Sequence, residues 1–264
     1  KLTAKTKEAL IKAQRNGIKI ILASGRPTSG LMDLGKELEM DKHNGLFVSF
    51  NGSKVVDCET MDVLFNAPMT VEQGKEVLEH MKKFNVKPMI DKDEYMYVND
   101  VYDCDITSKG QTINIIKYES RGGKFLLCEH NDLSAFVDYP LNKILTAGDD
   151  DYLQANYKEM MEPFKDTLNC MFTAPFFFEF TAKGIDKAKA LDTVLKPMGY
   201  KQEEMIAFGD GHNDISMVEY AGTGVAMSNA VQELNGISQY ITLSNDEDQI
   251  AEALYKYLPK KKKK

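Results

Sequence analysis

The stretch IKIILASGRP, residues 18–27, joins an apolar, β-branched run to a turn that contains glycine and proline. Because the run is short and follows Gly17, it predicts a buried strand over residues 18–23. The turn at Gly25–Pro27 then predicts a helix that ends near Met40. A strand that leads through such a turn into a helix is the unit from which α/β folds are built.

The segments on either side of this stretch fit the same fold. Thr3 is a suitable N-cap for a helix that stops at Asn16-Gly17. Residues Gly45–Phe50 form a second buried-strand pattern, and Asn51-Gly52 predicts a hairpin into Lys54–Val56. Strand, helix and strand at this spacing indicate a parallel sheet with helices on its faces.

The middle of the chain, residues 68–182, has short alternating stretches between two helices. This pattern is typical of an α+β domain with a mainly antiparallel sheet. The aromatic run Phe176–Phe180 is expected to be core of this domain rather than a binding surface. The expected elements are helices over Thr70 to about Phe84 and Asp150–Met161, and strands at Tyr95–Val98, Thr112–Tyr118, Lys143–Thr146, Phe172 and Phe176–Phe180.

The α/β pattern returns from Lys183 onward. We therefore predict a doubly wound, mostly parallel, Rossmann-like core made of residues 1–67 and 183–264, with residues 68–182 inserted as an α+β cap domain. The elements expected after the insertion are helices at Asp186–Lys196 and Asp246–Tyr257, and strands at Met205–Phe208, Gly224–Met227 and Tyr240–Leu243.

Composition and charge exclude several classes of protein. The 264-residue chain is 43% hydrophobic and 28% charged, and it has no apolar run near the ~18 residues that span a bilayer. We therefore expect a cytoplasmic protein without a membrane partner, whose oligomeric state the sequence does not indicate. The net charge of −7 argues against nucleic-acid binding, and Lys260–Lys264 is expected to be a solvated tail. Reduced thiols are expected at the widely separated Cys58, Cys104, Cys128 and Cys170.

Polar side chains follow the predicted strands, which is where open parallel sheets bind ligands. Ser24, Gly25 and Arg26 supply a hydroxyl, a flexible backbone amide and a guanidinium, which together suit a phosphate oxygen. By themselves, these three residues fit a serine helix cap with a turn glycine equally well.

The strand at Met205–Phe208 is followed by the segment GDGHND, residues 209–214. Its two carboxylates, Asp210 and Asp214, can hold a hard divalent cation through oxygen ligands, and the glycines keep the approach open. The alternative is a polar loop that caps the next helix. The spacing does not fit a calcium loop, and His212 is expected to face solvent because Mg²⁺ prefers oxygen ligands.

Two lysines, Lys183 and Lys187, flank Gly184 at the return to the core. A lysine that begins a core helix beside a strand end can neutralise a phosphoryl group as a compact charge. For either lysine, an ordinary place on the surface is the alternative.

Five segments of the chain occur in an order that resembles a known family. They are ASGRP at 23–27, FNG at 50–52, KGIDKAKAL at 183–191, GDGHND at 209–214 and GVAMSNA at 224–230. They look like the ordered motifs of the Cof-type phosphatases of the haloacid dehalogenase superfamily, sugar-phosphatase relatives with a large inserted cap. The resemblance covers nearly the whole chain.

The resemblance implies roles for the residues in these segments. Ser24 would hydrogen-bond the transferring phosphoryl group, and Lys187, rather than Lys183, would steady the nucleophile and the phosphoryl charge. Asp210 would ligate Mg²⁺, and Asp214 would support the metal directly or through water. The phosphate side of the site would be lined by Gly25, Arg26, Asn51, Gly52 and Asn213.

The first motif of the family, Asp-x-Asp-Gly-Thr after a buried strand, does not precede the first predicted helix. The segment Asp103–Thr107 has the right spacing, but it lacks the glycine and the apolar strand and falls inside the predicted cap. A missing central strand would orphan backbone groups at on the order of 1–3 kcal/mol each. We therefore expect about 15 to 25 further residues in the native protein, and no activity without them.

The sequence thus predicts a Mg²⁺-dependent phosphomonoester hydrolase that acts on a small phosphorylated metabolite, such as a sugar phosphate, through an aspartyl-phosphate. The alternatives are a phosphomutase, which shares this chemistry, and a non-catalytic protein that binds a phosphorylated metabolite. A response-regulator receiver uses similar residues but has no room for the insertion at residues 68–182. The cap would close over the leaving group, with Asp91, Tyr95 and Tyr97 as candidate contacts.

Overall fold

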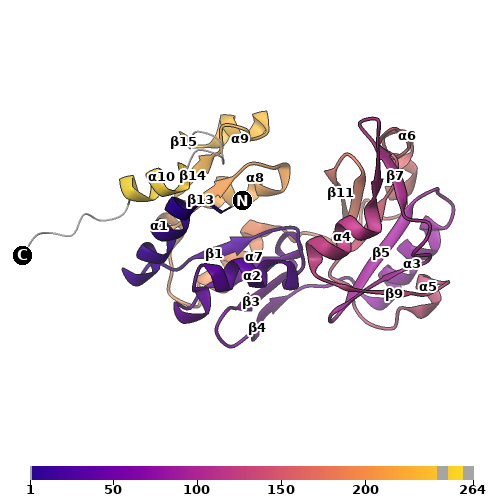
Figure 1. Ribbon diagram of the computed structural model, residues 1–264, viewed down its shortest axis with the longest axis horizontal. Helices are drawn as coiled ribbons and strands as arrows, with labels where there is room; N and C mark the ends of the chain where they lie inside the picture. Colours follow the sequence, from indigo (N-terminus) through magenta and orange to yellow (C-terminus); the bar gives the residue numbers. More distant parts are fainter. Residues whose placement is uncertain (1, 243–248, 258–264) are drawn as a thin grey trace, which may run out of the picture.

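The computed structural model describes residues 2–242 and 249–257, which fold into two parts (Figure 1). The core contains the first and the last described segments of the chain, and the cap contains the middle. The expected tail at Lys260–Lys264 and the start of the last predicted helix at Asp246 lie outside the described residues.

The N-terminal part of the core forms a four-stranded sheet. Strand β1 (Ile21–Ala23) runs parallel to β2 (Leu46–Ser49), and β3 (Lys54–Asp57) and β4 (Val63–Asn66) continue the sheet antiparallel. Thr3 caps the first helix as expected, because its side chain accepts a hydrogen bond from the N–H of Thr6. The helical elements here are α1 (Ala4–Arg15), α2 (Ser29–Glu37) and the 3₁₀ turns η1 (Met40–Lys42) and η2 (Phe50–Gly52).

The C-terminal part of the core forms a three-stranded parallel sheet, in the order β13 (Ile206–Gly209), β14 (Thr223–Ala226) and β15 (Tyr240–Ile241). Its strands match the predicted ones to within a few residues. Apolar side chains from both core sheets pack in one cluster, which includes Val48 of β2 and Ala207 of β13. The helical elements are α7 (Lys187–Leu195), α8 (Ile215–Tyr220), α9 (Gln232–Ile237), α10 (Gln249–Tyr257), η3 (Gln202–Glu204) and η4 (His212–Asp214).

Strands β1 and β13 lie at the edges of the two core sheets. Within residues 2–242 and 249–257, β1 pairs only with β2, and β13 pairs only with β14. The residues of β1 are half-buried, whereas the sequence pattern predicts a buried strand. The second edge of β1 has no strand beside it in the described part of the chain, which accounts for this exposure.

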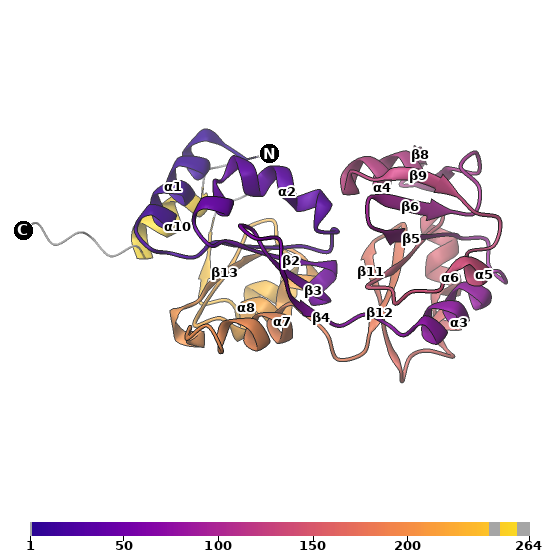
Figure 2. The same ribbon diagram turned by 90° about the horizontal axis from the view of Figure 1, so that it is seen from below.

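The cap forms a six-stranded sheet in the order β11-β12-β10-β5-β6-β9, antiparallel except where β6 meets β9. Helices α3, α5 and α6 cover one face, and α4 with the β7–β8 hairpin covers part of the other (Figure 2). The strands are β5 (Lys87–Lys92), β6 (Tyr95–Val98), β7 (Asp105–Ser108), β8 (Gln111–Asn114), β9 (Leu126–Glu129), β10 (Ile144–Ala147), β11 (Leu168–Ala174) and β12 (Phe177–Ala182). The helices are α3 (Val71–Met81), α4 (Ile115–Gly123), α5 (Leu133–Phe136) and α6 (Asp150–Met161).

One cap prediction was wrong, and one was confirmed. The stretch Thr112–Tyr118 was expected to be a strand, but β8 ends at Asn114 and the remainder is helical. The Asn114 side chain accepts a hydrogen bond from the N–H of Lys117 and so caps the N-terminus of α4. The helix therefore begins within the segment whose alternating pattern predicted a strand. The aromatic run does build the cap core, with Phe178 and Phe180 fully buried.

The fold class is the predicted one: an α/β core with parallel pairing in both sheets, and an α+β unit inserted between β4 and α7. Domain boundaries after residues 67 and 182 stay a proposal. None of the helices in the described ranges combines the length and the apolar character that a membrane crossing requires.

Candidate active site

The loops that follow β1 and β2 are joined by backbone hydrogen bonds. The N–H of Asn51 donates to the carbonyl of Ser24, and the N–H of Phe50 donates to the carbonyl of Arg26, both at 3.0 Å. The Ser24 hydroxyl accepts from the N–H of Arg26 at 3.2 Å. These bonds hold the serine at the carboxyl end of β1, where a ligand of a parallel sheet is expected.

Two glycines allow these loops to pack closely. A Cβ at Gly25 would lie 3.0 Å from the Oδ1 of Asn51. Gly52 has a φ of +100°, and a Cβ there would lie 2.2 Å from the carbonyl oxygen of Asp186. The second loop therefore rests directly on the residue that precedes helix α7, an approach that only glycine permits.

Helix α7 brings a buried lysine to the same place. The Asp186 side chain caps α7 by accepting from the N–H of Lys189, and Lys187 is the first residue of the helix. Lys187 is only 2% exposed, and its Nζ donates to the Oδ1 of Asp214 at 2.5 Å. The same Nζ lies 3.5 Å from the carbonyl oxygen of Ala23 at the end of β1.

The loop after β13 supplies the two aspartates. The Oδ2 of Asp214 accepts from the N–H groups of Asp210 and Gly211, at 3.0 and 3.1 Å. Burial alone would raise the pKa of Asp214, but Lys187 and these N–H groups hold it below its usual value. Asp214 is therefore ionised, and both of its oxygens are already engaged within the protein.

Asp210 is in a different electrostatic environment. Its partial burial and the neighbouring negative charge of Asp214 raise its pKa above the usual value. A cation would relieve this repulsion, and carboxylate oxygens are the ligands that Mg²⁺ prefers. The described part of the chain holds no group of three or more His, Cys, Asp or Glu side chains placed to bind a metal. Mg²⁺ fits such a sparse site, because it is commonly held by one or two carboxylates with water and substrate phosphate.

Of the remaining residues that the sequence analysis discussed, one contacts the site loops and three have exposed side chains. Asn213 reaches the site, because its Nδ2 donates to the Oδ1 of Asn51 at 2.8 Å. Arg26 is exposed, and no residue in the described ranges forms an ion pair with its guanidinium. Lys183, which directly follows cap strand β12, is also exposed and donates to the carbonyl of Lys165 rather than to a residue of the core loops. His212 faces solvent as expected, 3.6 Å from an equally exposed carboxylate.

Two cap side chains that the sequence analysis did not predict as site residues also reach these loops. Glu179 of β12 accepts from the Nδ2 of Asn51 at 3.1 Å, and Lys143 donates to the carbonyl of Gly25 at 3.3 Å. The sequence did contain a sign of this role: Glu179 stands between Phe178 and Phe180 in an otherwise apolar strand. A charge at such a position requires a specific partner.

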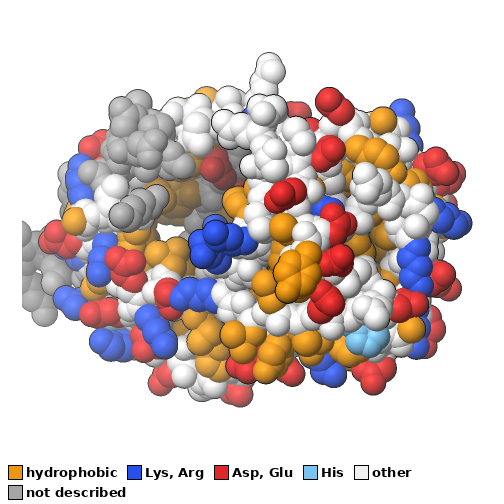
Figure 3. Space-filling view, turned by 45° about the vertical axis from the view of Figure 1, so that its right-hand side comes forward, with side chains coloured by type: hydrophobic (Ala, Val, Ile, Leu, Met, Phe, Trp, Pro, Cys, Tyr) orange, Lys and Arg blue, Asp and Glu red, His pale blue; other side chains and the backbone are white. Residues whose placement is uncertain are grey.

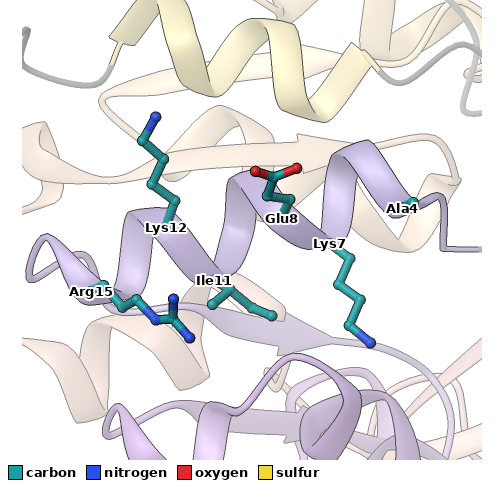
Figure 4. A pocket seen from close by; sticks show the side chains of 6 residues that line it. All are labelled: Ala4, Lys7, Glu8, Ile11, Lys12 and Arg15. Atoms are coloured by element: carbon teal, nitrogen blue, oxygen red, sulfur yellow. The ribbon is translucent and has the colours of Figure 1, made fainter.

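The surface has a hollow in which hydrophobic side chains are visible, with acidic and basic side chains at its margin (Figure 3). A separate pocket of about 410 Å³ lies along α1, on the side of the core away from the cap (Figure 4). Two of its cations are already paired with acids of the neighbouring segment, Lys7 with Glu37 and Arg15 with Glu39. The strand ends, rather than this pocket, therefore form the candidate active site. The pocket is lined by Ala4, Lys7, Glu8, Ile11, Lys12 and Arg15.

An α/β core with polar side chains at its strand ends and an inserted cap fits the class of haloacid dehalogenase-like hydrolases. Residues 1–254 match the model of that family, haloacid dehalogenase-like hydrolase, and the chain belongs to it. The predicted family and the prediction of an enzyme are thereby confirmed.

Three similar proteins illustrate this relationship. A haloacid dehalogenase-like hydrolase from Bacteroides thetaiotaomicron has a crystal structure that superposes with a TM-score of 0.87 at 31% identity, covering 97% of this chain and 92% of that one. A Streptococcus pyogenes serotype M6 protein, provisionally named a phosphatase, is 27% identical over 95% of this chain and 90% of its own length. The pyridoxal phosphate phosphatase of Escherichia coli is also 27% identical, over the same shares of the two chains.

Proposed function

We propose that this hydrolase is a Mg²⁺-dependent phosphatase that removes the phosphoryl group from a small phosphorylated metabolite, with sugar phosphates as the first class to test. The observation that carries the proposal is the buried ion pair between Lys187 and Asp214, at 2.5 Å, beside the Ser24 loop. The proposal is supported by a fixed cation on a buried carboxylate, with its Nζ 3.5 Å from the carbonyl oxygen of Ala23, the residue before Ser24. Phosphoryl transfer depends chiefly on such positioning and charge stabilisation.

In this proposal, each residue of the chain has a defined task. Ser24 and the Gly25 backbone hold the phosphoryl oxygens, with Asn51, Gly52 and Asn213 behind them, and Arg26 lines the outer rim. Lys187 offsets phosphoryl charge. Asp210 holds the metal, and Asp214 supports it by orienting Lys187 and the Asp210 loop. A bound Mg²⁺ would supply Lewis-acid stabilisation of the phosphoryl group. The family resemblance adds an aspartyl-phosphate intermediate, which forms when an aspartate attacks the phosphorus atom.

The test is a phosphatase assay on a panel of sugar phosphates, pyridoxal phosphate and a chromogenic phosphate ester, with Mg²⁺ or with a chelator. Wild-type protein expressed from the complete coding sequence is compared with Asp210→Asn, and with Asp41→Asn as an exposed core control. We expect turnover that requires Mg²⁺. At limiting Mg²⁺ the loss in Asp210→Asn is expected to be roughly a hundredfold or more, because a metal contributes several kcal/mol.

Other outcomes would contradict parts of the proposal. Undiminished activity of Asp210→Asn at limiting Mg²⁺ would overturn the metal assignment. Transfer of the phosphoryl group to a second sugar, dependent on a bisphosphate activator, would indicate a phosphomutase. Binding of a phosphorylated metabolite without turnover would indicate a binding protein.

A further inference from the structure

A continuous chain of polar side chains joins the cap to the three core loops that follow β1, β2 and β13. Asn213 donates to the Oδ1 of Asn51 at 2.8 Å, and the Nδ2 of Asn51 donates to the Oε2 of Glu179 at 3.1 Å. On the cap side, Lys143 donates to the Oε1 of Glu179 and to the carbonyl of Gly25, both at 3.3 Å. The chain therefore begins in the loop after β13 and ends in the loop after β1.

The members of this chain that lie at the boundary are buried. Lys143 is 7% exposed, Glu179 is 3% exposed and Asn51 is 6% exposed. Burial lowers the pKa of Lys143, but Glu179 and two other carboxylates outweigh it and hold the pKa above its usual value. Lys143 thus stays charged at neutral pH and pairs with Glu179.

The sheet register explains why these two charges face the core. Leu145 of β10 pairs with Glu179 of β12, so Glu179 lies on the same face of the cap sheet as Leu145. Lys143, two residues before Leu145, points to that face as well. An apolar pair of similar volume is often as stable as a buried ion pair, or more stable. The presence of the pair here therefore points to a role in geometry rather than in stability.

The carboxylate of Glu179 also determines how the Asn51 amide is oriented. An ionised carboxylate only accepts hydrogen bonds, so the NH₂ group of Asn51 has to face Glu179. The Oδ1 of Asn51 is then left to accept from Asn213. Lys143 acts in parallel on the Gly25 carbonyl, next to Ser24.

We infer that Glu179 and Lys143 are positioning residues, which align the Asn51–Asn213 and Gly25 loops for phosphoryl binding when the cap lies on the core. The inference rests on the proposed phosphatase function and extends it to the cap. The cap thereby contributes to phosphoryl binding itself, through core residues, independently of any contact that it makes with the leaving group.

The test uses Glu179→Gln, which preserves shape but can present an NH₂ group to Asn51, and Lys143→Met. The control is Glu162→Gln, which removes an exposed cap carboxylate that pairs with Lys165. Affinity for orthovanadate, as a phosphoryl mimic, is measured by calorimetry, and kcat and KM are measured on the chromogenic ester. We expect vanadate affinity and kcat/KM to fall roughly tenfold in Glu179→Gln, the effect of about 1.4 kcal/mol of lost alignment. A Glu179→Gln protein that folds and binds vanadate as well as the control would overturn the inference.

A double-mutant cycle separates positioning from general destabilisation. If Glu179 acts through Asn51, Glu179→Gln will not weaken vanadate binding further in an Asn51→Ala background. Additive losses would contradict the inference. Should Glu179→Gln fail to fold, the double variant Lys143→Met with Glu179→Gln removes both buried charges together and is expected to show the same binding defect. A wild-type protein that neither hydrolyses the ester nor binds vanadate would overturn the proposed function itself. An active wild type with an unchanged Glu179→Gln overturns only this inference.

Discussion

The core and the cap carry their site-facing side chains in different kinds of position. In the core, Ser24 and Asp210 lie in loops, each directly after a strand. In the cap, Glu179 lies inside β12 and Lys143 directly precedes β10, so both reach the site from the face of a sheet. A loop residue next to a strand can be found from a local motif. A residue on a sheet face can be found only when the register of the sheet and its docking partner are known.

The largest effect is expected in the core, from Lys187→Met. This change leaves the buried Asp214 without its cation, which costs about 3–5 kcal/mol of stability. Turnover is expected to fall roughly 100- to 1000-fold, because one preorganised charge beside the phosphoryl group is lost. Urea unfolding and the phosphatase assay measure the two effects.

Two further variants sharpen this result. Lys183→Met, at an exposed lysine outside the site, is expected to leave both quantities unchanged. Lys187→Met combined with Asp214→Asn removes both charges, and it is expected to recover stability without recovering turnover. Turnover of Lys187→Met equal to that of Lys183→Met would show that the buried lysine has no part in the chemistry.

The contrast between loop residues of the core and sheet-face residues of the cap explains how much of the fold and site could be predicted from the sequence. Helix α1 and helix α3 have local signals, the caps at Thr3 and Thr70, and their bounds were close to the observed ones. The loop segments could be proposed as a site because parallel strands gather their carboxyl ends at one edge. The contact between Asn51 and Glu179 joins residues 128 positions apart, and no local pattern encodes it. The wrong strand at Thr112–Tyr118 shows a related limit, since alternation and a helix cap competed within one short segment.

The second largest effect is expected on the free energy of unfolding, from Gly52→Ala in a core loop. Comparison with Gly110→Ala in a cap turn tests which of the two backbones is more tightly packed. Gly52→Ala would place a Cβ 2.2 Å from a backbone oxygen at a φ of +100°, so a loss of about 2–3 kcal/mol is expected. Gly110→Ala is the matched cap control, because Gly110 also has a positive φ of 75° but has no heavy atom within 4 Å of the added Cβ. Its loss should be about 1 kcal/mol, from backbone strain alone. Equal losses in urea unfolding would show that the close approach at Gly52 is relieved by the neighbouring loop.

A smaller effect on stability is expected from the cap residue Asp91, and this effect depends on pH. In the core, Asp214 has a lowered pKa, whereas burial raises the pKa of Asp91 in β5 to about 6, only partly offset by Lys143 and Lys54. A raised pKa means that the folded state binds the proton more tightly than the unfolded chain does. The contribution of Asp91 to wild-type stability therefore falls as pH rises from about 4 to about 6, because this partly buried carboxyl group ionises less readily in the folded state.

Asp91→Asn removes this ionisation. We expect the variant to be more stable than wild type by on the order of 2 kcal/mol above pH 6, and equal to it below about pH 4. Unfolding by urea across this pH range measures the difference. A constant difference between the two proteins at every pH would mean that the Asp91 charge is not the cause.

The smallest effect is expected from Asp103→Asn and Asp105→Asn, the cap acids whose spacing imitates a catalytic aspartate pair. Both side chains are exposed, and Asp103, two residues before β7, pairs with Lys87. Exposed pairs contribute about 0–1 kcal/mol, so stability should change by less than about 1 kcal/mol and turnover by less than roughly twofold. The matched comparison is Asp210→Asn, the same chemical change in a core loop. If either cap variant lost turnover as Asp210→Asn does, the chemistry would lie in the cap, and the core would be the part that only positions it.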